Sequence, residues 1–288
     1  CQSIKKFHDQ PLRKASLELF ATLGYESDRT VETRSVQDFR DQFDPETKLD
    51  HPAALVTYWQ SADLLFQLTD EELSNTTALF KDESVRTSLL QSYVFIAIEL
   101  SPGDYSRGKL TGIARQINRI FPMPVMVLIK HFSAEKPVLS IAVINRRQHK
   151  RDAQKDVLGK VTIIREVSLF EPHRGHLDIL ASFALPNLVH PQRLPINNFD
   201  TLHATWEEIF NVELLNKNFY RELSNWFFWA KQHCRFPFYD AKADKYDLFH
   251  DSEKVKEHEA KNLIRLLTRT LFVWFIKQRG LVPDALFN

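Results

Sequence analysis

The apolar positions between residues 92 and 169 predict a β-sheet with a helix inserted in it. Four runs are rich in β-branched and aromatic residues, which is typical of buried strands: 92–100, 124–132, 138–147 and 160–169. After the first run, SPGDYS predicts a turn, and Ser106 is a candidate N-cap. The following apolar residues, from Leu110 to Phe121, recur at i, i+3, i+4, i+7 and i+11, as in an amphipathic helix. A strand, a crossover helix and further strands favour a mixed α/β sheet.

The segments before and after this predicted sheet have weaker helical patterns. Pro11 and Gly24 bracket a helical repeat of leucine and phenylalanine, with Gly24 at the C′ position. The segment 61–90 is predicted to hold one or two helices, SADLLFQL and then ESVRTSLLQS. A short helix is predicted at 173–185.

The last third of the sequence has a helical period throughout. PNLVHPQRLPINN (186–198) contains three prolines and predicts a linker. Three amphipathic stripes follow, and Asp200 is the candidate cap of the first. Their apolar residues are Leu202, Trp206, Ile209 and Phe210; Phe219, Leu223, Trp226, Phe227 and Ala230; and Ile264, Leu267, Leu271, Trp274 and Phe275. The expected fold is an α/β module (1–188), a mixed sheet with flanking helices, followed by an all-α helical module (199–288).

Composition narrows the class of protein. With 288 residues, 43% of them hydrophobic, the chain can bury a core. No apolar run approaches the roughly 18 residues of a membrane span. Two cysteines cannot form a disulfide framework, so a reducing, cytoplasmic setting is expected. The chain begins with Cys and stops soon after a helix, which leads us to expect a fragment of a longer protein.

The net charge of +1 hides a strong asymmetry. Residues 26–104 contain 16 Asp and Glu against 6 Lys and Arg, whereas residues 101–165 contain 13 Lys and Arg against 4 Asp and Glu. Segregation of this kind favours a polyanionic partner for the basic segment, and double-stranded DNA is the partner we expect. In the alternative, the two segments neutralise each other within one fold.

Two groups of cations make up the candidate DNA-binding surface. One lies on the helix after Ser106, and the other in NRRQHKRDAQKDVLGK (145–160), which is predicted to be a loop. Guanidinium and ammonium groups suit phosphate oxygens. The candidate residues are Arg107, Arg115, Arg119, Arg146, Arg147, Lys150, Arg151 and Lys155. A solvated loop with ion pairs to its own aspartates is the alternative.

A nuclease of the PD-(D/E)xK type is a second hypothesis, because such enzymes combine an α/β core with a basic face. Their chemistry requires two acidic residues and a lysine around Mg²⁺, which would be a cofactor only in this case. Glu99 lies on a predicted strand, but Ser101 stands where the lysine is expected, which argues against cleavage. Asp63, Asp70 and Glu18 are possible partners of Glu99 without diagnostic spacing.

Other motifs are weak or absent. His173 and His176 lack further Cys or His neighbours in sequence, so they do not form a zinc pattern. The seven glycines never form G-x-G, and there is no Pro-Pro pair, so no nucleotide or S-adenosylmethionine loop is visible. We therefore assign no catalytic, cofactor-binding or metal-binding residue from the sequence.

Five segments of the chain resemble a known family. They are PLRKASLELFATLGYES, ARQINRIFPMPVMVLIKH, LSIAVINRRQHKRDAQKDVLGKVTIIREVSLFEPHRGHLDIL, FYRELSNWFFWAKQHCRFP and LIRLLTRTLFVWFIKQRGLVPDALF. Together they are similar to the N-terminal region of large type II restriction-modification DNA methyltransferases, adenine-specific and type IIG-like. The likeness covers nearly the whole chain, in the right order.

The resemblance implies a role without a catalytic centre. In that family, a methyltransferase domain with a glycine-rich S-adenosylmethionine loop and an Asn-Pro-Pro-Tyr/Phe motif follows this region, and neither motif occurs here. The expected function is that of an N-terminal, DNA-contacting accessory part of a DNA N6-adenine methyltransferase. S-adenosylmethionine is expected for the parent enzyme, and the downstream methyltransferase domain is an expected partner of the helical module. A protein-interaction scaffold that does not bind DNA is the third hypothesis.

Overall fold

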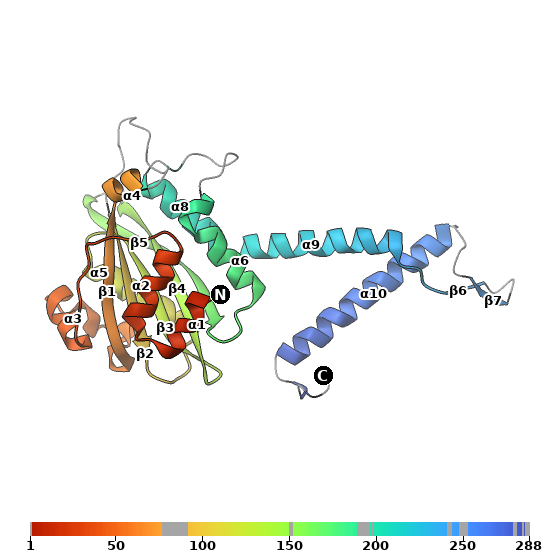
Figure 1. Ribbon diagram of the computed structural model, residues 1–288, viewed down its shortest axis with the longest axis horizontal. Coiled ribbons are helices and arrows are strands. Elements are labelled where there is room, and N and C mark those ends of the chain that lie inside the picture. Colours follow the sequence, from red (N-terminus) through yellow and green to blue (C-terminus); the bar gives the residue numbers. More distant parts are fainter. Residues whose placement is uncertain are drawn as a thin grey trace. The chain divides into compact units, whose positions relative to one another are not determined.

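The computed structural model describes residues 2–76, 92–149, 152–188, 196, 198–240, 244–247, 253–278, 281–283 and 285 (Figure 1). The chain forms two compact units, Cys1–Leu215 and Asn216–Asn288, called here the first and the second unit. The helices are α1 (Gln2–Asp9), α2 (Leu12–Thr22), α3 (Val36–Phe43), α4 (Asp70–Thr76), α5 (Arg107–Ile120), α6 (Arg174–Phe183), α7 (Leu185–Leu188), α8 (Phe199–Ile209), α9 (Val212–His233) and α10 (Glu253–Gln278). The strands are β1 (Trp59–Thr69), β2 (Ser92–Leu100), β3 (Val125–Ser133), β4 (Lys136–His149), β5 (Asp152–Ser168), β6 (Phe238–Asp240) and β7 (Lys245–Asp247).

The first unit is built on a five-stranded mixed sheet in the order β1-β2-β3-β4-β5. Strands β2 and β3 are parallel and are connected through α5, whereas the other neighbours are antiparallel. This confirms the fold class expected from the sequence, an α/β module followed by a helical module. The helical module also contains a short hairpin, β6-β7, that the sequence analysis did not predict.

Both faces of the sheet are buried. Because side chains alternate along a strand, Phe95 and Ile96 belong to different hydrophobic clusters. The Phe95 face is covered by α1, α2, α6, α7 and α8, and the Ile96 face by α3, α5 and the turns between α3 and β1. In Figure 1, α2 lies in front of the sheet and α5 behind it.

The residues predicted to begin α5 and to end α2 have these roles in the structure. The Ser106 hydroxyl accepts a hydrogen bond from the Lys109 backbone N–H at 3.4 Å, which caps α5. Gly24 follows α2 with a φ of +88°, a left-handed conformation that a residue with a Cβ atom rarely adopts.

Two predictions about local structure were wrong. SADLLFQL forms most of strand β1 rather than a helix, because both faces of this strand are buried and its apolar run has no alternation. The second helix predicted in this segment, ESVRTSLLQS (83–92), lies outside the described residues except for its last residue, Ser92. Within the predicted basic loop at 145–160, residues 145–149 and 152–160 instead belong to strands β4 and β5, which pair from Arg146–Leu158 to His149–Asp152, while Lys150 and Arg151 lie outside the described residues.

Helix α8 differs from its prediction in cap and in packing. Asn198, not Asp200, caps the helix: the Asn198 side chain accepts from the Thr201 N–H at 2.9 Å, and the Thr201 hydroxyl accepts from the Asn198 N–H at 3.3 Å. Trp206 of this helix is fully buried in the same cluster as the sheet. The first unit therefore extends to Leu215, beyond the boundary expected between residues 188 and 199.

The second unit contains most of α9, the β6-β7 hairpin and α10. Arg235, after α9, donates to the buried Glu259 carboxylate of α10 at 2.9 Å. His258 of α10 is hydrogen-bonded to the Pro237 carbonyl at 2.9 Å, which holds the hairpin against the start of α10. Within the described part of the chain, neither of these helices nor any other has the length and apolarity needed to cross a membrane.

Candidate functional site

Helix α5 presents three arginines, whose described hydrogen-bond acceptors are neutral groups. The Arg115 guanidinium donates to the Gly159 carbonyl of β5 at 3.1 Å, and Arg119 donates to the Gln116 side-chain oxygen at 3.1 Å. Both acceptors are neutral. Among the described residues, no carboxylate forms an ion pair with Arg107, Arg115 or Arg119. A like-charge i,i+4 pair costs a few tenths of a kcal/mol, which an anionic ligand would offset.

The Arg115–Gly159 hydrogen bond brings α5 against the strand that carries the other candidate cations. The structure describes only the backbone of Arg146, Arg147 and Lys155, which lie on the paired ends of β4 and β5 beyond Gly159. Lys150 and Arg151, between these strands, lie outside the described residues. The fold thus places α5 close in space to β5, which pairs with the end of β4. The side chains of Arg146, Arg147 and Lys155 are not described.

The acidic segment forms its described ion pairs mainly within itself. Arg40 pairs with Asp50, Lys48 with Glu46 at 2.8 Å, and Arg29 with Glu72 at 3.8 Å. Among the described side chains, the Lys130–Glu99 pair is the one that joins the acidic to the basic segment. Mutual neutralisation, the alternative interpretation of the charge asymmetry, therefore receives little support from the described residues.

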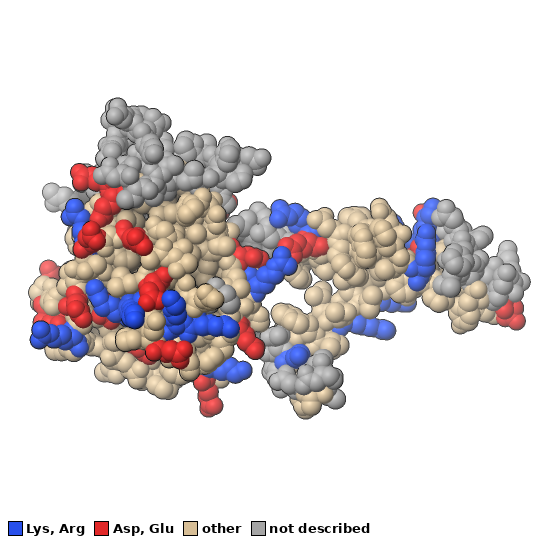
Figure 2. All heavy atoms as spheres, in the orientation of Figure 1, with Lys and Arg blue, Asp and Glu red and all other residues tan. Residues whose placement is uncertain are grey.

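The two signs of charge are mixed on the side of the first unit that Figure 2 presents, where Lys and Arg alternate with Asp and Glu around α1, α2 and α3. A DNA duplex needs a surface on which positive charge prevails. This mixed face is therefore a poor candidate for contact with a duplex.

A polar row crosses three strands of the sheet on the α2 face. Ser61 of β1 pairs with Glu99 of β2, and Glu99 pairs with Lys130 of β3. The Lys130 ammonium lies 2.9 Å from the Glu99 carboxylate, and both side chains are mostly buried. Asp63 pairs with Ala97, one diagonal step from Glu99 on the same face. At such positions, Cβ atoms are about 7 Å apart, close enough for two carboxylates to share a cation.

Asp63 is the most perturbed carboxyl of this row. It is 7% exposed, and the Thr33 hydroxyl lies 3.4 Å from its carboxylate. Burial raises the pKa of Asp63 above its ordinary value, while the charge of the Arg13 guanidinium opposes the rise. The charged groups that act on this carboxyl are Arg13, which lowers its pKa, and Glu32, which raises it. A buried carboxyl with a raised pKa occurs at functional sites and also in structural networks.

The perturbed Asp63 predicts a pH dependence of stability. Because folding raises the pKa, the folded chain holds this proton more tightly, and the stability it contributes is lost as pH rises from about 4 through the raised value. We expect Asp63→Asn, which resembles the protonated form, to gain stability relative to the wild type as pH rises above about 4, the ordinary pKa of an aspartate. Urea unfolding at several pH values measures this difference, with Asp28→Asn, an exposed carboxyl, as the control. A difference that is constant with pH would contradict the prediction.

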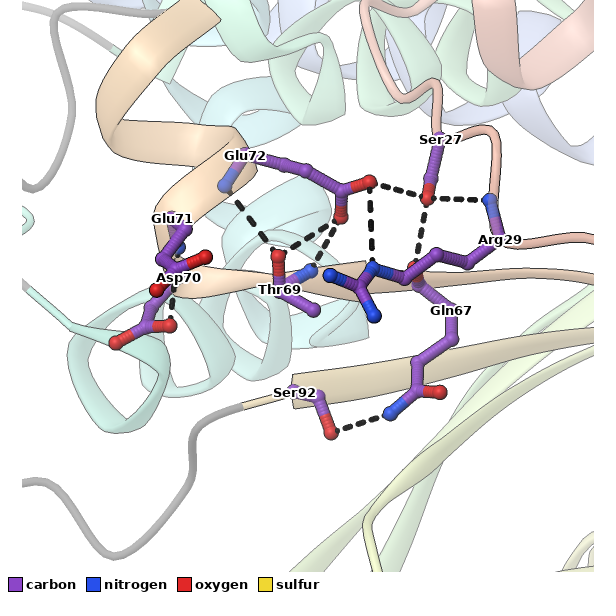
Figure 3. A network of polar contacts seen from close by, with 8 residues as sticks. All are labelled: Ser27, Arg29, Gln67, Thr69, Asp70, Glu71, Glu72 and Ser92. Carbon is purple, nitrogen blue, oxygen red and sulfur yellow. Dashed lines mark hydrogen bonds and ion pairs between the residues drawn. The ribbon is translucent and has the colours of Figure 1, made fainter.

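The network in Figure 3 is a helix start rather than a catalytic centre. Glu72 of α4 accepts from the Thr69 backbone N–H at 2.8 Å and from the Ser27 hydroxyl at 2.6 Å, and the Thr69 hydroxyl accepts from the Glu72 N–H at 3.3 Å. This is a capping box at the end of β1. Its carboxylate is held by these donors, so its structural role is sufficient to explain it.

Two of the proposed acidic partners of Glu99 lie elsewhere. Asp70 follows β1 at the end where Thr69 pairs with Ser92, seven residues along β2 from Glu99 and so about 24 Å away. Glu18 pairs with Lys6 at 2.7 Å and lines an open cavity of about 330 Å³ beside Phe66. Only Asp63, of the three, lies near Glu99.

His131 of β3 is held inside the fold by packing and hydrogen bonds. His131 is buried, and burial lowers its pKa. Its Nε2 atom lies 2.8 Å from the hydroxyl of Ser140, a residue that is also completely buried and therefore closed to substrates. The rings of His173 and His176 are 6.0 Å apart. Within the described residues, no three His, Cys, Asp or Glu side chains are grouped to hold a metal ion.

Lys130 is the residue of this row that the sequence analysis missed. A PD-(D/E)xK pattern requires the lysine on the strand of the second acid, where this chain has Ser101. The parallel register of β2 and β3 instead brings a lysine of the next strand beside Glu99. The signal in the sequence was a single lysine at the end of the otherwise apolar run PVMVLIKHF.

Comparison of the chain with protein-family models, with curated proteins and with solved structures finds no match to any of them.

Proposed function

We propose that this chain is the N-terminal, DNA-contacting part of a restriction-modification DNA N6-adenine methyltransferase, acting in the cytoplasm. The observation that carries the proposal is the set of α5 guanidinium groups without a carboxylate partner among the described residues, next to the paired strands that hold Arg146, Arg147 and Lys155. The resemblance of the five sequence segments supports the enzyme class. S-adenosylmethionine would be bound by the methyltransferase domain of that enzyme.

The chemistry of α5 suits the backbone of a duplex. Arginine forks donate to two phosphate oxygens at once, and each phosphate that is neutralised releases counterions. Contacts of this kind hold a duplex without reading its bases. The role that follows is positioning of DNA, with sequence recognition and methyl transfer left to other parts of the enzyme.

Duplex affinity as a function of salt tests this proposal. We expect the logarithm of the association constant of the full chain to fall linearly with the logarithm of salt concentration. Arg115→Ala/Arg119→Ala should weaken binding roughly 10-fold to 100-fold at low salt and reduce the slope by about 2, equally for unrelated sequences. Fluorescence anisotropy with a labelled duplex measures both quantities.

Lys14→Ala is the matched control, because Lys14 is an exposed cation of α2 on the other face of the sheet. This variant should bind as the wild type does. A salt dependence without slope, or an equal loss in the Lys14 variant, would refute DNA contact through α5.

Metal-dependent cleavage of phosphodiester bonds is a second candidate function. The specific observation in its favour is Lys130, which supplies beside Glu99 the ammonium group that is missing at position 101. Mg²⁺ is commonly held by one or two carboxylates together with water and substrate phosphates, so Asp63 and Glu99 fit this ion. When bound, Mg²⁺ would neutralise charge on the phosphate, and Lys130 would hold the attacked phosphate in place.

A further inference from the structure

The second unit exposes an unusual amount of apolar surface. Among the described residues of its two helices, twelve large apolar side chains are 37–63% exposed: Phe219, Tyr220, Trp226, Phe228 and Trp229 on α9, and Ile264, Leu266, Leu271, Phe272, Val273, Trp274 and Phe275 on α10. The fully buried apolar side chains among the described residues of this unit are Ala230, Val255 and Leu263. So small a core cannot stabilise the unit alone.

Helices α9 and α10 of this unit lie close together at one end and separate toward the other. Ala230, near the end of α9, and Leu263 of α10 are fully buried, and Figure 1 shows the two helices approaching each other at the end where the β6-β7 hairpin lies. Phe219 and Trp226 lie on the same side of α9 as Ala230, and Trp274 lies on the same side of α10 as Leu263, given 100° per residue. These three side chains are nevertheless 46%, 39% and 56% exposed. The facing sides are thus closed at one end of the helix pair and open at the other.

The end of α10 is apolar around its whole circumference. Residues 271–276, LFVWFI, are consecutive and so point in all directions around the helix. A helix that is hydrophobic all round is normally enclosed by protein on several sides. A flat partner would cover only part of it, so this segment requires a partner that surrounds it.

We propose that a second copy of this chain covers this surface, with the end of α10 from each copy inserted between α9 and α10 of the other. The two open helix pairs would then form a four-helix bundle around a shared core, with the same residues contributed by both copies, as a two-fold axis requires. Each copy would fill the open side of the other and have the end of its own α10 enclosed.

The exposed area agrees with a dimer. Aromatic side chains present 150–250 Å² each, so the twelve side chains expose about 1,200 Å² per copy. A stable interface buries about 800 Å² per partner. The area is therefore larger than a dimer needs, and far beyond the few hundred Å² of apolar patch that monomeric proteins tolerate.

Sedimentation velocity of the full chain between about 1 and 100 µM tests this assembly. We expect a dimer, and we expect Phe272→Ser/Trp274→Ser to weaken it at least 100-fold. Phe219→Ser/Trp226→Ser, on the facing side of α9, should do the same. Tyr58→Ser/Phe170→Ser is the control, since these exposed aromatic residues belong to the first unit, and the dimer should persist. Circular dichroism of each variant verifies its helix content.

Several results would overturn the inference. A wild-type monomer over the whole range would mean that another partner, such as a methyltransferase domain, covers the surface. A dimer lost in the Tyr58/Phe170 control, or kept in both helical variants, would place the interface elsewhere. The test uses no DNA, so its outcome is independent of the proposed contact through α5.

Discussion

Replacing Trp206 with alanine is expected to lower the free energy of unfolding of the first unit by about 3–5 kcal/mol. The indole is completely buried between the sheet and α6, with Tyr25, Tyr93 and Phe183 around it. Truncation would leave a cavity that the surrounding rings cannot fill. It would also remove the indole N–H, which donates to the Tyr25 hydroxyl at 2.9 Å.

The hydrogen bonds around Tyr25 explain why the effect should be large. The Tyr25 hydroxyl donates to the Phe183 carbonyl at 2.7 Å and so connects the turn after α2 with α6, while Trp206 adds α8. Burial raises the pKa of Tyr25 well above its ordinary value, so this hydroxyl remains a donor. Loss of the indole leaves a buried oxygen with one partner fewer.

Trp206→Phe is the matched variant, because it keeps a ring but removes the N–H. We expect it to cost about 1–2 kcal/mol, less than half of the alanine effect. Urea unfolding followed by far-ultraviolet circular dichroism measures both. If alanine cost less than about 1 kcal/mol, α8 would not be packed on the sheet, and the boundary between the modules would lie before it, where the proline-rich segment suggested.

The strands from 92 to 169 could be predicted because their sequence pattern and their environment agree. β2 and β3 are buried on both faces, and each is a short apolar run between turn residues. α5 was equally clear, since its apolar stripe, its Ser106 cap and the prolines after it all indicate the same boundaries.

β1 and α8 could not be predicted in the same way. The run SADLLFQL has no alternation, and a short apolar run of this length fits a helix or a buried strand equally well. Its strand partner, β2, is separated from it by more than twenty residues, so pairing is invisible locally. For α8, the sequence predicted the helix correctly, but an apolar stripe does not specify the surface that it packs on.

The prediction of the candidate sites was limited in the same way, because contacts between distant segments cannot be seen in the local sequence. The α5 cations were predicted from charge, because a helical repeat reveals which residues point away from the core. The neighbours of Glu99 depend instead on the register between strands, which only the fold determines. The sequence offered Asp63, Asp70 and Glu18 as equal choices, and the register selects Asp63.

Lys130→Met is expected to lower the free energy of unfolding by about 2 kcal/mol, because it leaves the mostly buried Glu99 carboxylate without its ion pair. Glu99→Gln/Lys130→Met should recover most of this loss, since no uncompensated charge then remains. Urea unfolding of the three proteins completes a double-mutant cycle. A double variant as unstable as Lys130→Met would contradict a direct pair.

The same variants decide whether this pair does more than stabilise the sheet. If Asp63, Glu99 and Lys130 cleave DNA, the wild-type chain should nick supercoiled plasmid with Mg²⁺ or Mn²⁺, and Glu99→Gln/Lys130→Met should lose at least about 100-fold in rate. Because the double variant is expected to recover most of its stability, unfolding cannot explain a loss of its activity. Arg115→Ala/Arg119→Ala separates the two candidate functions: it should weaken DNA binding and leave the rate at saturating DNA unchanged. Absence of nicking by the wild-type chain would leave the row a structural ion pair, and DNA contact through α5 would remain as the proposed function.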